Sequence, residues 1–60
     1  MKNYLFEITS REYEGERFFI YANNREECDK TLALYFPDEE VELQGIYSDE
    51  EADILGYDTY

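Results

Sequence analysis

The sequence contains no histidine, no tryptophan and only one cysteine in 60 residues. Without histidine, the chain lacks the side chain that most often transfers protons or binds metal ions near neutral pH. No serine, threonine or cysteine of the chain has a histidine beside it that could act as a general base and activate it as a nucleophile. A chain of this length rarely forms a cleft that holds two carboxylates at the roughly 5–9.5 Å separation of a glycosidase. We therefore expect neither enzyme activity nor a cofactor.

The single cysteine, Cys28, excludes an internal disulfide, on which small secreted domains usually depend. We expect a reduced, partly buried thiol on a helix, and a disulfide-linked dimer or a reactive thiol is the alternative. The acidic neighbours Glu26, Glu27 and Asp29 would raise the pKa of the thiol, which argues against a thiolate nucleophile.

The chain also has no run of about 18 apolar residues and no charged-then-apolar leader. An anionic membrane surface would repel so acidic a protein. These features predict a soluble, cytoplasmic protein with no membrane partner.

Basic residues are scarce as well: five stand against sixteen acidic residues, which gives a formal net charge of −11. Self-repulsion of this size destabilises a small domain, so we infer that the charge serves a function. The sign of the charge opposes direct nucleic-acid binding and favours a basic partner. Seven tyrosines and four phenylalanines exclude a disordered acidic tail, because such segments are poor in aromatic residues.

Hydrophobic periodicity predicts three strands and two helices. The predicted elements are strands over Tyr4–Thr9, Arg17–Ala22 and Val41–Tyr47, a long helix from an Asn24 cap to Tyr35 and a short helix from a Ser48 cap to Leu55. Glu27 and Glu51, each three residues after its cap, complete two capping-box patterns. Pro37 ends the long helix, and Gly56 is placed to cap the short one.

These elements predict a single α+β domain over residues 1–60 with the order β-β-α-β-α. The first two strands form a hairpin, and the third strand lies antiparallel to the first, which gives a three-stranded antiparallel sheet of order 2-1-3. A sheet of order 1-2-3, in which the third strand pairs in parallel with the second, stays open as the less common arrangement. The long helix covers one face of the sheet.

The second face of the sheet has two interpretations. It is either closed by the short helix and the tyrosines of the tail Tyr57–Tyr60, or it forms an exposed aromatic patch. Strict alternation places Ile46 on the face opposite to Val41 and Leu43. The second strand is expected to be an exposed edge to which another strand can be added. Arg17 is its only charged residue that would hinder such pairing.

This topology gathers the acidic residues at two ends of strands about 20 Å long. One pole comprises Glu12, Glu14, Glu16, Asp38, Glu39 and Glu40, and the other comprises Glu26, Glu27, Asp29, Asp49, Glu50, Glu51 and Asp53. Each cluster also has a structural explanation, because acids in the first turn of a helix are stabilised by its dipole. The run from Asp49 to Asp53 lacks the alternating ligands and the central glycine of a calcium loop, so we expect no specific metal site.

Three acidic clusters suggest a class of protein. They are Glu26-Glu27-Cys28-Asp29, Pro37-Asp38-Glu39-Glu40 and Ser48-Asp49-Glu50-Glu51-Ala52-Asp53. In these clusters and in composition, the chain resembles the small, acidic, tyrosine-rich and cysteine-poor proteins of phages and mobile elements. Many of these are anti-CRISPR or anti-restriction proteins that inhibit host defence, often by mimicking DNA. The resemblance carries no diagnostic motif and implies no shared fold.

The charge and the resemblance together predict a non-catalytic inhibitor that occupies the basic surface of a nucleic-acid-binding host protein, such as a CRISPR effector or a restriction enzyme. The alternative is a small structural or regulatory adaptor that forms a homodimer through its sheet edge or its aromatic face. The expected partner contacts are Glu26, Glu27, Asp29, Asp38, Glu39, Glu40, Asp49, Glu50, Glu51 and Asp53, with Tyr47, Tyr57 and Tyr60 as aromatic anchors.

Overall fold

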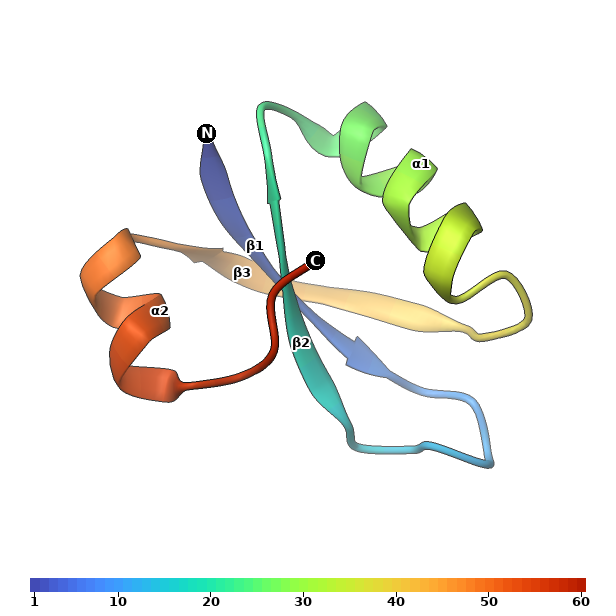
Figure 1. Ribbon diagram of the computed structural model, residues 1–60. Helices are drawn as coiled ribbons and strands as arrows, with labels where there is room; N and C mark the ends of the chain where they lie inside the picture. The colour runs from blue at the N-terminus through green and yellow to red at the C-terminus, as the bar shows by residue number, and fades with distance from the viewer.

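A computed structural model describes all 60 residues (Figure 1). The elements are β1 (Lys2–Ile8), β2 (Arg17–Ala22), α1 (Arg25–Tyr35), β3 (Val41–Tyr47) and α2 (Asp49–Leu55). The three strands form one sheet of order β2-β1-β3, and β1 is antiparallel to both neighbours. The predicted α+β class, element order and antiparallel sheet are confirmed. Neither helix is long and apolar enough to cross a lipid bilayer.

The face of the sheet beneath α1 holds the main hydrophobic core. Alternate residues of β1 face their partners on β2, so that Phe6 lies opposite Phe18 and Tyr4 opposite Ile20. The buried cluster comprises Tyr4, Phe6, Ile8, Phe18, Ile20, Ala22 and Cys28. Leu32 of α1 packs against it, as the helical spacing from Cys28 predicts.

The first strand lies two residues earlier at its start, and one residue earlier at its end, than the alternation predicted. Lys2 already pairs with Ala22 across the hairpin. At the other end the ladder closes at Ile8, whose N–H donates to the Glu16 carbonyl. The N–H of Thr9 instead donates to the carbonyl of Glu40 at 2.8 Å, which ties the hairpin to the turn before β3.

Both helix caps form, but one differs from the predicted box. Ser48 and Glu51 make the full reciprocal capping box at the start of α2. At the start of α1, the Asn24 side chain accepts from the N–H of Glu27 at 2.9 Å, as predicted. The Glu27 carboxylate, however, accepts from the N–H of Asn23 at 2.9 Å and not from that of Asn24. The carboxylate therefore fixes the residue before the cap and so the exit of the chain from β2.

A β-bulge in β3 overturns the predicted facing of Ile46. The register shifts between Leu5, which lies opposite Gly45, and Phe6, which lies opposite Leu43, so Gln44 is the extra residue. Beyond the bulge Ile46 lies opposite Tyr4, on the same face as Leu43. Because of this one inserted residue, the side chains after the bulge point to the opposite face from the one that strict alternation predicts.

The outer edge of β2 is not exposed, contrary to the prediction. The tail after α2 runs parallel to β2, with Thr59 bridging to Phe19 (Figure 1). The N–H of Phe19 donates to the Asp58 carbonyl at 2.8 Å, and the N–H of Tyr60 donates back to the Phe19 carbonyl at 2.9 Å. The tail thus covers the edge of β2, and β3 is the strand left at an open edge.

The second face of the sheet is closed at its centre. Leu5 and Phe19 are 3% and 0% exposed. Tyr47 packs edge-on to Phe19 with ring centroids 6.1 Å apart, and Tyr57 lies 5.9 Å from the same ring. The closed alternative is therefore the correct one for this part of the face, and Tyr21 at its margin stays 43% exposed.

Candidate protein-interaction surfaces

The hairpin and the turn after α1 form one end of the molecule, here named the hairpin end (residues 9–16 and 36–40). The carbonyl of Glu40 accepts from the N–H and hydroxyl of Thr9 and from the hydroxyl of Ser10. The N–H of Glu40 donates to the Ser10 hydroxyl. These bonds hold together two loops that are about 30 residues apart in the sequence, at the lower right of Figure 1.

A groove of about 330 Å³ lies between these two loops. Its apolar lining comes from Ile8, Tyr13, Tyr35, Phe36 and Pro37, and its acidic lining from Glu16, Asp38 and Glu39. Tyr13 and Tyr35 keep 46% and 56% of their surfaces exposed, so aromatic surface is accessible within an acidic rim.

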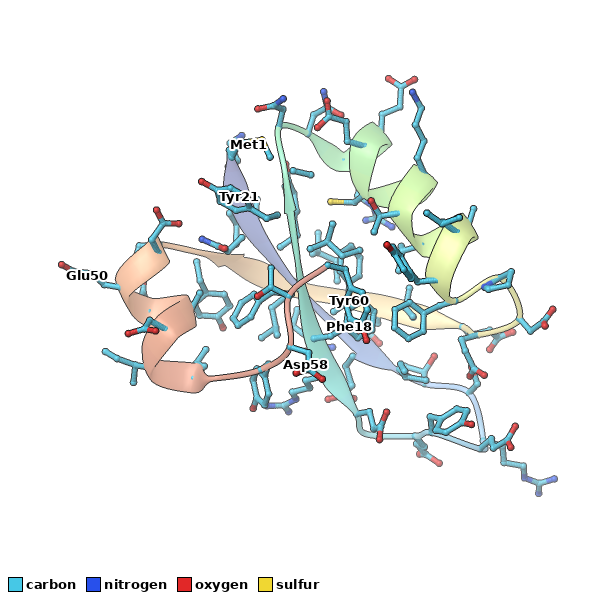
Figure 2. The ribbon with its side chains drawn as sticks, viewed as in Figure 1. Met1, Phe18, Tyr21, Glu50, Asp58 and Tyr60 are labelled. Carbon is cyan, nitrogen blue, oxygen red and sulfur yellow. The ribbon has the colours of Figure 1, made fainter.

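The first turns of both helices form the opposite end, here named the capping end (Glu26, Glu27, Asp29, Asp49, Glu50, Glu51 and Asp53). The sheet separates its two halves, because α1 packs on the face of Phe6 and α2 on the side of Tyr47. In Figure 2 the Glu50 side chain extends from α2 away from the rest of the molecule.

Four of the ten acids predicted as partner contacts have structural bonds within the chain. Glu27 accepts from the N–H of Asn23, the residue before its helix cap, and Glu51 accepts from the N–H of its cap, Ser48. Asp49 accepts from the buried amide of Asn3 at 2.7 Å, and Asp29 pairs with Arg25 at 3.1 Å. The two hydrogen bonds from Asn23 lower the pKa of Glu27, as expected for a carboxylate whose charged form is hydrogen-bonded.

Five other predicted contacts make no side-chain hydrogen bond or ion pair and are exposed. They are Glu26, Asp38, Glu40, Glu50 and Asp53. The remaining acid, Glu39, differs from all the others: its Oε2 atom is buried and has no hydrogen-bond partner.

Glu12, Glu14 and Glu16 belong to a predicted acidic pole but not to the predicted partner contacts. All three are exposed at the hairpin end, and Glu16 lines the groove together with Asp38. Tyr13 was also not identified, because only the folded hairpin brings it to the same groove as Tyr35. Its position between Glu12 and Glu14 was the one signal in the sequence.

The chain neutralises little of its own charge. Only two ion pairs form among the sixteen acidic residues, Arg17 with Glu7 at 3.0 Å and Arg25 with Asp29 at 3.1 Å. Both pairs are exposed, where such contacts contribute about 0–1 kcal/mol. The hydrogen bond to Glu7 raises the pKa of Arg17, so this cation stays fully charged.

The three predicted aromatic anchors serve the fold to different degrees. Tyr47 and Tyr57 are half-buried against Phe19 and close the second face. Tyr60 lies over Phe18 in Figure 2, with ring centroids 5.7 Å apart, and is 40% exposed. It is therefore the anchor with the most surface left for a partner.

Cys28 is unpaired and buried on the side of α1 that faces the hydrophobic core. Burial raises the pKa of its thiol, and the carboxylates of Asp29 and Glu27 raise it further against the opposing effect of Arg25. The thiol is therefore a core side chain in its neutral form, as the acidic neighbours in the sequence suggested.

A second hollow of about 280 Å³ beside α2 is lined by polar residues, but its Asp49 is already bonded to Asn3. No three acidic or cysteine side chains come together in a way that could hold a metal ion. The accessible chemistry is thus that of unneutralised carboxylates at two ends and aromatic surface at one of them. No protein-family model, no curated protein and no solved structure matches the chain.

Proposed function

We propose that this protein is a non-catalytic inhibitor that binds the basic surface of a nucleic-acid-binding protein, of the CRISPR-effector or restriction-enzyme type. The observation that carries the proposal is the small degree of internal neutralisation: two ion pairs for a net charge of −11. Such a protein would act in the cytoplasm, in a host cell if a phage encodes it.

The arrangement of the acids supports competition with nucleic acid. Duplex DNA presents one negative charge per about 1.7 Å of its axis, and its protein partners carry rows of lysine and arginine to match. The longest extent of this protein is 30 Å, so its two acidic ends lie along a length comparable to a short stretch of duplex DNA. The bonds between the hairpin and Glu40 hold the hairpin-end acids on ordered loops, which lowers the entropy lost on binding.

Capture of partners from a bacterial lysate, followed by mass spectrometry, tests the proposal. The charge-reversal variant is Glu50→Lys with Asp53→Lys, because neither residue caps a helix and the fold should persist. A second variant, Glu12→Lys with Glu14→Lys, reverses the other end. Nuclease subunits recovered by the natural chain and lost by either variant support the proposal, and equal recovery by all three proteins overturns a charge-driven contact.

Salt provides an independent measurement on the captured complex. If the carboxylates take the place of nucleic-acid phosphates on the partner, the affinity of the complex should fall steeply between 50 and 200 mM salt, because salt screens the attraction between exposed charges. An affinity that is unchanged over this range would contradict the proposal.

The alternative function, a self-associating adaptor, has lost two of its supports. The tail occupies the edge of β2, and Leu5 and Phe19 on the second face are buried. Size-exclusion chromatography with light scattering distinguishes the two functions, because an adaptor should dimerise without any partner.

A further inference from the structure

We propose that the groove at the hairpin end binds an arginine side chain of the basic partner, in preference to lysine. The identity of the partner rests on the proposed function, whereas the arginine preference rests on the groove itself. A groove of about 330 Å³ lies at the lower end of the range for ligand sites, about 300–1,000 Å³, so it suits one side chain and not a folded element.

The charge of the groove selects a cation. Glu16, Asp38 and Glu39 line it, and no lysine or arginine does. The Oε2 atom of Glu39 is buried without a hydrogen-bond partner. The Glu39 side chain makes no hydrogen bond within the chain, so its carboxylate can accept a charge-assisted hydrogen bond from a donor that a ligand brings.

The aromatic lining selects arginine among the cations. Tyr13 and Tyr35 offer accessible ring surface beside the carboxylates. A guanidinium group is planar and weakly hydrated, so it stacks on a ring while it donates several N–H groups to carboxylates. An ammonium group is a compact and strongly hydrated point charge, which gains less from the same surface.

The chain contains one internal example of the same chemistry. The guanidinium carbon of Arg25 lies 5.2 Å from the centroid of the Phe6 ring. The same side chain donates from Nε to Asp29 at 3.1 Å. One arginine thus uses an aromatic face and a carboxylate together, which is the combination that Tyr13 or Tyr35 and Asp38 present to an external ligand.

The test is a titration of the ¹⁵N-labelled protein, followed by NMR, with three peptides of equal length. Acetyl-(Arg-Gly)₄-amide is the probe, its lysine counterpart keeps the charge, and its citrulline counterpart keeps the shape without the charge. We expect shifts centred on the amides of Tyr13, Asp38 and Glu39, about fivefold weaker binding of the lysine peptide and none of the citrulline peptide.

Matched variants locate the contact. Tyr13→Ala should remove the preference for arginine while leaving residual charge-driven binding, and Glu39→Gln should weaken both cationic peptides. Glu50→Gln, at the capping end, removes one negative charge, as Glu39→Gln does, and should leave both affinities unchanged. The dispersion of each spectrum shows that the variant is folded.

Equal affinity for arginine and lysine peptides, or shifts spread over both ends, overturns the groove as an arginine site. The proposed function is tested separately by capture from a lysate. Arginine binding in the groove without recovery of any nucleic-acid-binding protein would leave the site standing and reject the function. Recovery that depends only on Glu50 and Asp53 would support the function and reject the groove as its contact.

Discussion

The side-chain amide of Asn3 donates a hydrogen bond of 2.7 Å to the Asp49 carboxylate, and so joins the start of β1 to the first turn of α2. Asn3 is only 6% exposed, and its second amide hydrogen reaches the Tyr47 carbonyl at 3.3 Å. Asp49 is thus an acid with a structural partner, unlike its neighbour Glu50.

Asp49→Ala should lower the free energy of unfolding by about 1–3 kcal/mol, because it leaves a buried N–H without an acceptor. Asp49→Asn should lose much less, since the amide oxygen can still accept from Asn3. Urea denaturation of the two variants measures the difference. Equal losses would mean that the charge of Asp49, and not its hydrogen bond, stabilises α2.

Glu27 should make the stability of the protein depend on pH. Its hydrogen bonds to Asn23 lower the pKa of the carboxyl in the folded state below its ordinary value near 4.5. This stabilisation is fully present above pH 4.5 and is lost as the pH falls through the lowered folded pKa. Unfolding of the natural chain and of Glu27→Gln, measured from pH 7 to pH 2.5, should give curves that converge at the acidic end.

The matched control for Glu27 is Glu26→Gln, one residue earlier and without a side-chain bond. The difference in the free energy of unfolding between Glu26→Gln and the natural chain should not shrink in this way as the pH falls. If both variants converged alike, the effect would come from the charge of the first turn and not from the bonds to Asn23.

Added salt should stabilise the free protein while weakening its complex. Self-repulsion from a net charge of −11 opposes folding, and screening reduces it. Each kcal/mol of relief raises the melting temperature of a domain this small by about 4–8 °C. The double variant Glu26→Gln with Glu50→Gln should show a smaller rise between 10 and 300 mM NaCl, and a melting temperature that falls with salt would contradict this view.

The elements of the fold were predictable because their signals are local. Alternation over Tyr4–Ile8 and the Ser48–Glu51 box each depend on a few neighbouring residues. The bulge at Gln44 was missed because alternation was extended through it. The three-residue step from Leu43 to Ile46, with Gly45 inside a strand, is the trace that a bulge leaves in a sequence.

The features that were missed depend on contacts between distant residues. The tail pairs with β2 through only Asp58, Thr59 and Tyr60, too few residues for periodicity to register. The groove likewise needs Tyr13 from the hairpin and Tyr35 from α1. Clusters of acids could be placed at the two ends from topology, but which carboxylates are bonded within the chain required the side-chain geometry.

The tail should act as a removable edge strand for β2. Tyr60 packs on Phe18 and Phe36, with centroids 5.7 Å and 5.2 Å away, and its carbonyl accepts from the N–H of Tyr21 at 3.0 Å. Tyr60→Ala removes this packing and should lower the free energy of unfolding by about 2 kcal/mol. Ile54→Ala, at a position 83% exposed, should change it by less than about 0.5 kcal/mol.

Hydrogen exchange distinguishes loss of the tail from general loosening. In Tyr60→Ala the amides of Phe19 and Tyr21, which donate to the tail, should exchange faster relative to that of Ile20 on the same strand. A chain ending at Gly56 exposes the whole edge of β2 and should self-associate more than the full chain in size-exclusion chromatography with light scattering, because an open edge accepts a strand from another copy. Unchanged exchange at Phe19 and Tyr21, with no added association, would show that β2 does not need the tail as its neighbour.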